Sequence, residues 1–431
     1  MKFNKFQIII LAIFVIFIIA GVAGFALYRG SSNSTILPNV TIWGTFPSRV
    51  FEQYLGTLNS GLVQNLKVTY VEKSQAAFAQ DFINALARGL GPDAILVPAD
   101  MVLPEVNKIT IIPYTALTQR DFLNMYVGEA NVYLTADGII AVPFTIDPLM
   151  MYWNRDTFNA AGLSTYPKYW DEFTDLNRRL TTKDSNGNIR KTAIAMGDFA
   201  NMTNAREVLG SLMMQVGNPI IIQSGDTAIS TLKTSISASP VPAVQFFSQF
   251  ANPSSPNYSW NRGLPNDKTA FLSGLLATYF GFASELSDIH AKNPNLNFDV
   301  APLPQAKSGG VKAAYGRMYG FSIVRASANP NAAFQVISTL VSPDYLKLLA
   351  KTMYLPTVRI DAPISDPADP YISVFNQAAL ISRTWLDVGQ AASNKIFGTL
   401  IQSVVSGQKT ADEAVNDAGD QYDVALKQAM Q

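Results

Sequence analysis

The stretch AVPFTIDPLMMYWNRDTFNAAGL, residues 141–163, decides the fold. It begins as an apolar, strand-like run and contains two prolines, Pro143 and Pro148, before it passes into a segment typical of a capped helix. Proline removes a backbone donor, so a strand is expected to break at each of these positions. We therefore predict a crossover between two lobes here, with the large side chains of residues 151–153 beside a ligand-stacking surface.

Strand-like and helix-like segments alternate around this stretch. The pattern predicts strands at residues 40–43, 66–71 and 93–100, and helices at residues 48–60, 75–88 and 170–180, with a further helix beginning near residue 155. Alternation of this kind is typical of an α/β protein with a parallel sheet.

Composition limits the classes of function. At 431 residues, 48% of them hydrophobic, the chain is long enough for two or three domains and can bury a sizeable core. Lys plus Arg equals Asp plus Glu at 32 each, so no net charge attracts nucleic acid. The absence of cysteine excludes disulfides, thiolate metal sites and a lipid-modified N-terminal cysteine.

The N-terminus carries a candidate membrane anchor. Residues 6–27 contain no charge, and a helix of that length can cross the hydrocarbon core of a bilayer. Lys2 and Lys5 precede it, which predicts a cytoplasmic N-terminus and an extracellular or periplasmic bulk. We thus expect a transmembrane anchor in residues 1–30 and a tether in residues 31–39; a cleaved signal peptide is the alternative.

Catalytic and metal-binding motifs are sparse. His290 is the only histidine, so a Ser-His-Asp triad or a histidine-rich metal site would depend on it alone. A calcium loop near residues 183–191 would need an acid at its twelfth position, where Ala193 stands, so the Asn186-Gly187 pair predicts a turn instead. We expect no enzymatic activity, no metal and no cofactor; a glycoside hydrolase needs only two carboxylates, but no paired acidic motif stands out.

Several segments together resemble one family. They are VTIWGTF (40–46), LGPDAILVPADMV (90–102), the segment from 141 to 180 with its Pro-x-x-Trp-x-Glu-Phe pattern, KTAFLSGLLATYFGFASEL (268–286), NFDVAPLPQA (297–306), YGRMYGFSIV (315–324) and YLPTVR (354–359). In this order they resemble the extracellular solute-binding proteins of ABC importers, specifically the maltose-binding-protein-like family for sugars and oligosaccharides. The family usually has threonine before the tryptophan, where this chain has Tyr169.

The resemblance implies a type II periplasmic-binding-protein fold of two α/β lobes that close on a solute, like a Venus flytrap. It implies one lobe from residues 40–145 and 305–340 and another from residues 146–304 and 341–431, with crossings at 144–148, at 301–304 and after Leu340. It also implies a monomer that delivers a carbohydrate to ABC permease subunits. A sensor or adhesin that uses the same fold without transport is the alternative function.

The resemblance and the residue types together give the candidate ligand contacts. Sugars require aromatic faces for stacking and polar groups for hydrogen bonds to hydroxyls. The candidates are Trp43, Thr45, Phe46, Asp100, Phe144, Asp147, Tyr279, Gly281, Phe282, Tyr315, Arg317 and Trp385. A core position is the alternative for each aromatic residue, a helix N-cap for Asp147, and a structural ion pair for Arg317. Trp153 and Trp170 are expected in the core.

Overall fold

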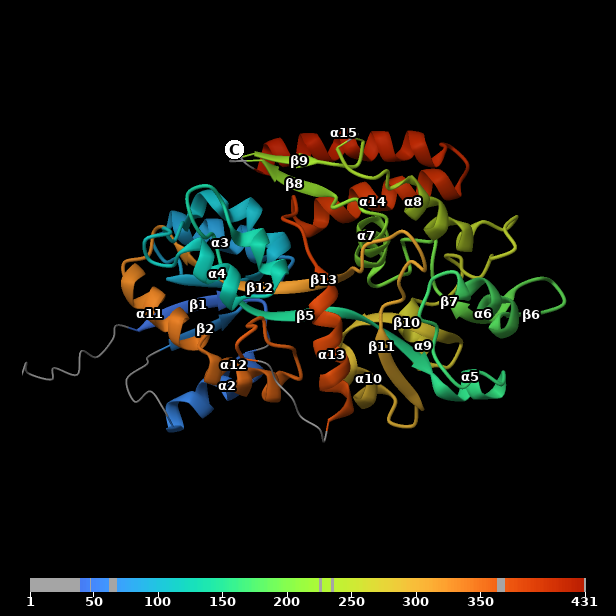
Figure 1. The fold of residues 1–431 in the computed structure, drawn as a ribbon, viewed down its shortest axis with the longest axis horizontal. Helices are drawn as coiled ribbons and strands as arrows, with labels where there is room; N and C mark the ends of the chain where they lie inside the picture. The colour runs from blue at the N-terminus through green and yellow to red at the C-terminus, as the bar shows by residue number, and fades with distance from the viewer. Residues whose placement is uncertain are drawn as a thin grey trace, which may run out of the picture.

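The computed structural model describes residues 39–46, 48–61, 68–224, 227–233, 236–362 and 369–429. Its backbone is an 11-stranded mixed sheet in which two long strands, β5 (Val142–Asn154) and β12 (Ala314–Val324), lie at the centre. Figure 1 shows β5 running across the middle of the molecule between the two sides of the sheet. We call these the β1 side and the β10 side.

β5 joins the two sides by changing its neighbours. Residues Val142 to Pro148 pair antiparallel with β12, whereas Leu149 to Asn154 pair with β10 (Leu276–Phe282) and β11 (Phe298–Pro302). The expected breaks at the two prolines were wrong, because the strand continues through both. Pro143 lies opposite Gly320 at an irregularity in the ladder, and Pro148 lies where β5 exchanges β12 for β10, so each missing donor falls where regular pairing is interrupted.

The β1 side is a parallel sheet covered by helices. β1 (Val40–Gly44) pairs with β2 (Val68–Glu72) and β3 (Ala94–Pro98), and β3 pairs antiparallel with β12. The covering helices are α2 (Ser48–Gly61), α3 (Phe78–Ala87), α4 (Gln119–Met125), α11 (Pro330–Leu340) and α12 (Pro343–Met353). α11 packs on β1 and β12, and α12 packs on α2. Phe144 lies in the core of this side, among Phe46, Phe51, Tyr54 and Phe321.

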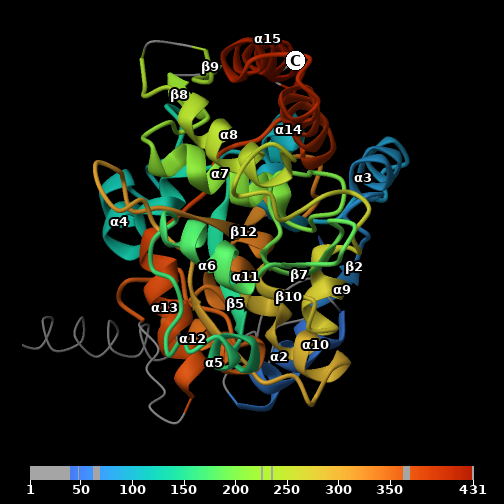
Figure 2. The ribbon, with the colours of Figure 1, turned by 90° about the vertical axis from the view of Figure 1, so that its right-hand side faces the viewer.

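The β10 side contains both parallel and antiparallel pairs. β10 pairs parallel with β7 (Ile189–Ile194), which forms a hairpin with β6 (Thr182–Lys183) through the predicted Asn186-Gly187 turn. Its main helices are α5 (Arg155–Ala160), α6 (Glu172–Leu180), α7 (Ala205–Gln215), α8 (Val241–Ser248), α9 (Asp267–Leu272), α10 (Leu286–Lys292), α13 (Pro370–Ile381), α14 (Gln390–Val405) and α15 (Ala411–Ala429). In both ribbon views α14 and α15 lie together at the top of the molecule (Figures 1 and 2).

The prediction of parallel strand pairing is therefore confirmed for β1 to β3 and for β7 with β10. The two long central strands, β5 and β12, are instead antiparallel to each other and to their main neighbours. Trp153 and Trp170 are buried, as expected. The expected stacking surface at residues 151–153 was wrong, because the Tyr152 hydroxyl donates to the Phe282 carbonyl inside the β10 side and Trp153 packs on Phe158.

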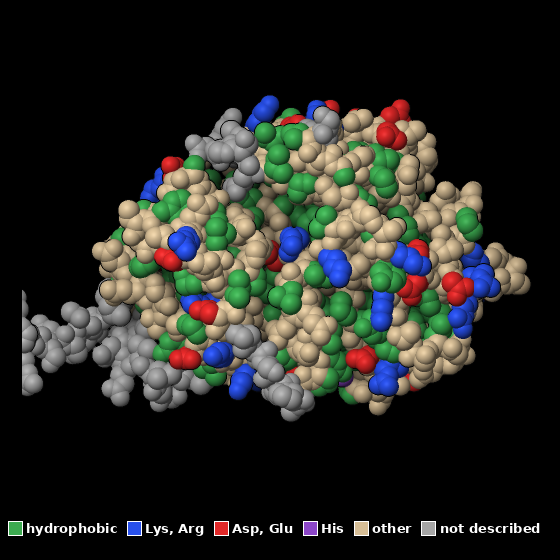
Figure 3. Space-filling view, viewed as in Figure 1, with side chains coloured by type: hydrophobic (Ala, Val, Ile, Leu, Met, Phe, Trp, Pro, Cys, Tyr) green, Lys and Arg blue, Asp and Glu red, His purple; other side chains and the backbone are tan. Residues whose placement is uncertain are grey.

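The predicted membrane anchor, residues 6–27, lies outside the described residues, as does the tether up to residue 38. Within the described ranges no helix combines the length and the apolar character needed to cross a bilayer. On the face shown in Figure 3, Lys and Arg side chains are interspersed with Asp and Glu.

Candidate functional site

A buried arginine joins the two sides of the sheet. Arg206 Nη2 donates to Asp100 Oδ2 at 2.7 Å and to Glu207 Oε1 at 2.8 Å, and its Nη1 donates to Asp387 Oδ2 at 2.8 Å. All four side chains are at least 96% buried. We call these four residues the Arg206 cluster. Asp100 comes from the β1 side, directly after β3, whereas Arg206 comes from α7 on the β10 side.

Helix α7 holds the cluster in place because every one of its residues is buried. Ser211 Oγ accepts a hydrogen bond from the Tyr315 backbone N–H at 2.8 Å, which attaches the middle of α7 to β12. Gln215 Nε2 donates to the carbonyls of Ala313 and Pro304, and this attaches the end of α7 to the chain on either side of residues 305–312. A charged pair such as Arg206-Glu207 at the start of a fully buried helix must find partners inside the protein.

Burial and neighbouring charges shift the pKa values of Asp387 and Arg206. Burial raises the pKa of Asp387 to about 6, although Arg206 acts in the opposite direction and the Tyr422 hydroxyl donates to the carboxylate at 2.8 Å. Burial alone would lower the pKa of Arg206, but Glu207, Tyr315, Asp100 and Asp387 together raise it. The guanidinium is therefore charged at all physiological pH values.

A second polar group lies where β5 and β12 meet. Asp147 and Arg317 are directly opposite each other in the antiparallel register. The Asp147 carboxylate accepts from Ser284 N at 3.0 Å and from Ser284 Oγ at 2.6 Å, and burial raises its pKa to about 6 against the effect of Arg317. The Arg317 guanidinium lies 3.8 Å from the centre of the Phe282 ring, a cation–π contact.

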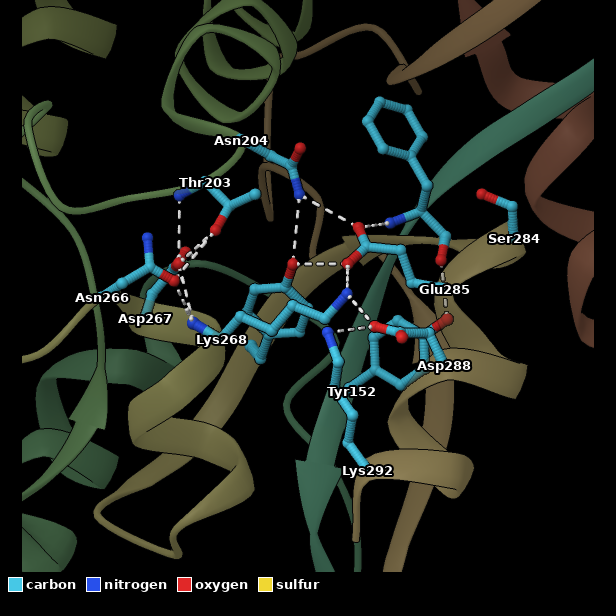
Figure 4. A network of polar contacts seen from close by, with 12 residues as sticks. Tyr152, Thr203, Asn204, Asn266, Asp267, Lys268, Ser284, Glu285, Asp288 and Lys292 are labelled. Atoms are coloured by element: carbon cyan, nitrogen blue, oxygen red, sulfur yellow. Dashed lines mark hydrogen bonds and ion pairs between the residues drawn. The ribbon is translucent and has the colours of Figure 1, made fainter. Parts of the chain in front are cut away.

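The turn that carries Phe282 and Ser284 is fixed by Glu285. Glu285 accepts from Phe282 N at 2.9 Å, the Tyr279 hydroxyl at 2.8 Å and Lys268 Nζ at 2.6 Å; Figure 4 shows these contacts converging on its carboxylate. Asn204 Nδ2, from the loop before α7, donates to the Phe280 carbonyl at 3.0 Å. The network thus holds Phe282 against Arg317 and connects the turn to α7.

Several buried polar atoms near these residues have no hydrogen-bond partner among the described residues. They are Asp100 Oδ1, both Glu129 carboxylate oxygens, Arg317 Nε, Thr384 Oγ1 and Trp385 Nε1; Thr45 Oγ1, directly after β1, and Trp153 Nε1, in the β10-side core, are also unpartnered. Buried polar atoms are normally hydrogen-bonded, so a group of unpartnered ones marks a place where a ligand would supply the missing contacts. Asp100 follows β3 on the β1 side and Arg317 lies in the central strand β12. Thr384 and Trp385 follow α13 on the β10 side.

The structure brings half of the predicted contacts together. Asp100, Asp147, Phe282, Tyr315, Arg317 and Trp385 surround the Arg206 cluster and the β5–β12 junction; Trp385 packs on Tyr315 with ring centres 5.1 Å apart. Thr45 contributes one of the unpartnered buried atoms.

The other predicted contacts lie elsewhere. Phe144 is fully buried in the β1-side core and Phe46 packs on it, whereas Tyr279 belongs to the Glu285 network. A Cβ at Gly281 would lie 2.4 Å from the Tyr279 ring, so this glycine permits close packing within the β10 side. Trp43 is half-buried, with Lys73 Nζ 4.0 Å from the centre of its ring.

The sequence-based list of ligand contacts omitted Arg206, Glu207, Glu129, Thr384 and Asp387. One signal was present, since Arg206-Glu207 stands at the head of the otherwise mostly apolar run AREVLGSLMM. No local pattern marked Glu129, because only the tertiary fold brings it near residues 383–386.

The architecture and this site define a two-lobed binding protein with polar groups buried between its lobes. The model of the bacterial extracellular solute-binding protein family matches residues 51–347. The chain belongs to this family, which confirms the resemblance found in the sequence, and it is a binding protein rather than an enzyme.

Solved structures agree on the fold. The cyclic alpha-maltosyl-1,6-maltose binding protein of Arthrobacter globiformis aligns over 91% of this chain and 99% of its own, with a TM-score of 0.73 and 15% identity. A cyclo/maltodextrin-binding protein complexed with maltotetraose aligns over 91% and 97%, with a TM-score of 0.70 and 15% identity. CpMnBP1 with mannobiose bound aligns over 89% and 99%, with a TM-score of 0.66 and 19% identity.

Proposed function

We propose that this protein captures a carbohydrate outside the cytoplasm and delivers it to the permease of an ABC importer. Residues 6–27 would hold it at the membrane, in place of the lipid anchor that a chain without cysteine cannot carry. The energy for transport would come from ATP hydrolysis by partner subunits, so the chain itself needs only to bind, close and release.

One observation carries this proposal: unpartnered buried polar atoms lie beside aromatic faces where the two sides of the sheet meet. Asp100 Oδ1 and the Glu129 oxygens would accept hydrogen bonds from hydroxyl groups, whereas Arg317 Nε and Trp385 Nε1 would donate. The rings of Tyr315, Phe282 and Trp385 offer apolar surface in the same region. This combination suits sugars, and the solved structures named above include maltotetraose and mannobiose complexes.

We further propose that binding closes the two lobes. The first lobe would comprise residues 40–145 and 305–340, and the second residues 146–304 and 341–431; the packing of α12 on α2 favours moving Pro343–Met353 into the first lobe. The Arg206–Asp100 pair would then form on closure, since its partners come from different lobes. A ligand that binds the closed form better shifts the population toward it.

The test is a thermal-shift screen of the purified full chain against neutral malto-, manno- and cello-oligosaccharides, with peptides, polyamines and nucleotides as controls. A ligand at 100 times its dissociation constant adds about 2.7 kcal/mol to the free energy of unfolding, which raises the melting temperature visibly. Small-angle scattering with the best ligand then measures closure as a decrease in the radius of gyration. A folded protein that responds to no saccharide would contradict the proposal and favour the sensor or adhesin function.

A further inference from the structure

A pocket of about 260 Å³ opens beside the Arg206 cluster. Its walls are the short helix η3 (Gly128–Tyr133), Ile221 at the start of β8 (Ile221–Ser224), and residues 383–386, which follow α13. η3 lies between β4 (Ile109–Thr110) and β5, whereas residues 383–386 lead through Asp387 to α14. The pocket is therefore formed by segments that are far apart in the sequence.

Three residues that line this pocket carry buried polar atoms without a hydrogen-bond partner among the described residues. Both carboxylate oxygens of Glu129 lack a hydrogen-bond partner, although the residue is only 5% exposed. Trp385 Nε1 and Thr384 Oγ1, from two other lining residues, are also buried and unpartnered. A buried carboxyl group without a hydrogen-bond partner lowers the stability of the folded protein. A ligand that donates hydrogen bonds or carries positive charge would supply the missing contacts of Glu129.

The pocket lies among several buried charged groups. The buried acidic groups are Asp100, Glu129, Asp147, Glu207 and Asp387, whereas the cationic groups among them are Arg206 and Arg317. These groups act on one another: burial lowers the pKa of Arg317 whereas Tyr319, Asp147 and Glu207 raise it, and burial, Glu129 and Asp100 all raise the pKa of Tyr133. Burial raises the pKa of Glu129 well above its usual range and Arg383 acts in the opposite direction, so an ammonium group bound at Glu129 would act as Arg383 does and favour the ionised carboxylate.

Arg383 is the other charged residue that lines the pocket. Its side chain donates to the Ser382 carbonyl at 2.6 Å and the residue is exposed, so water screens part of its charge, although the charge still acts to lower the pKa of Glu129. Glu129, in contrast, is enclosed, and its interaction with a bound cation would be only weakly screened.

We propose that this pocket binds a sugar unit carrying a protonated amine, with the ammonium group on Glu129 and the ring oxygens accepting from Trp385 Nε1 and Thr384 Oγ1. This inference rests on the proposed carbohydrate binding and narrows its ligand to amino sugars. Trp385 also supplies an apolar ring face, which suits the C–H surface of a sugar better than a simple polyamine.

The test uses sugars that differ only at carbon 2. Calorimetry on the full chain compares glucosamine, galactosamine and mannosamine with their N-acetyl forms and with glucose, galactose and mannose; the β-1,4-linked disaccharides of the glucose series are included. We expect the amines to bind at least about tenfold more tightly than the matched hydroxyl compounds, since a charge-assisted hydrogen bond adds about 1.5–3 kcal/mol.

Glu129→Gln should remove this preference while leaving neutral sugars bound. Asp267→Asn is the matched control, because it removes a buried carboxyl on α9 that is outside the pocket, and it should keep the preference. Circular dichroism and melting temperature establish that each variant is folded. If Glu129→Gln does not fold, the preference of the wild-type protein for the amine over the hydroxyl compound is the test of the inference.

The inference is overturned if the amines and the matched hydroxyl compounds bind with equal affinity, or if the Glu129→Gln variant still prefers the amines. It also fails if none of these sugars binds. Neutral oligosaccharides that still bind in the thermal-shift screen would then leave carbohydrate capture standing, whereas silence in both assays would contradict both proposals.

Discussion

Arg206 Nη2 and Asp100 Oδ2 lie 2.7 Å apart although the two residues are 106 positions apart and belong to opposite sides of the sheet. Both side chains are almost fully buried, so this ion pair is screened little by solvent. The pair is therefore expected to contribute to the stability of the chain and, in the proposed mechanism, to the closure of its lobes.

Arg206→Met should destabilise the protein by about 3–5 kcal/mol, because it leaves Asp100, Glu207 and Asp387 buried without their cation. Urea unfolding of the full chain measures the change. Arg190→Met is the control: Arg190 pairs with Asp184 at 2.7 Å but is exposed, and a change below about 1 kcal/mol is expected there. Equal effects of the two variants would contradict a structural role for the cluster.

Trp385→Ala should weaken carbohydrate binding by about 1–3 kcal/mol, because it removes both the ring beside Tyr315 and the unpartnered Nε1 donor. Titration calorimetry with the best ligand measures the loss. Trp153→Ala removes an equally large buried ring that packs on Phe158. It should lower the melting temperature without a selective loss of affinity, and similar affinity losses in both variants would argue against a ligand contact at Trp385.

The free energy of unfolding should fall as the pH rises from about 4 to about 6. The pKa values of Asp147 and Asp387 are about 6 in the folded protein, against about 3.9 in an unfolded chain. The folded state therefore binds more protons in this window, and raising the pH favours unfolding.

Urea unfolding at several pH values measures this slope, and Asp147→Asn should reduce it. Asp184→Asn is the control, because the pKa of Asp184 is lowered to about 2, so this group is ionised in the folded protein throughout the window and cannot cause a fall in stability there. A slope in Asp147→Asn equal to that of the wild type would show that the Asp147 carboxyl does not titrate as its burial implies.

Gly281→Ala should destabilise the protein by about 1–3 kcal/mol, because the added Cβ would lie 2.4 Å from the Tyr279 ring in the network that holds Phe282. Gly56→Ala is the matched control. Nothing lies within 4 Å of a Cβ at that position in α2, so alanine should stabilise the helix by about 0.5–1 kcal/mol. Thermal unfolding compares the two, and a neutral Gly281→Ala would mean that the turn can relax.

Local chemistry explains which expectations succeeded. Alternating apolar segments predicted β1 to β3 and their helices, because hydrophobic periodicity and loop residues act within a few positions. The prediction for β5 failed at its prolines, since a strand tolerates proline where its neighbour is irregular or changes, and that depends on β12 and β10. For the aromatic candidates, residue type alone did not separate Trp385, which packs on Tyr315, from Phe144 in the core.

The sequence by itself determined the family, the order of most elements and several polar residues of the candidate site, such as Asp100, Asp147 and Arg317. These follow from composition, periodicity and motifs, which are properties of neighbouring residues. Only the tertiary structure decided that Arg206 joins Asp100 to Asp387, and that Glu129, whose carboxylate oxygens lack a hydrogen-bond partner among the described residues, lines the same pocket as Trp385. The reason is physical: a buried charge is defined by the groups that fold around it, and here those groups come from segments more than 100 residues apart.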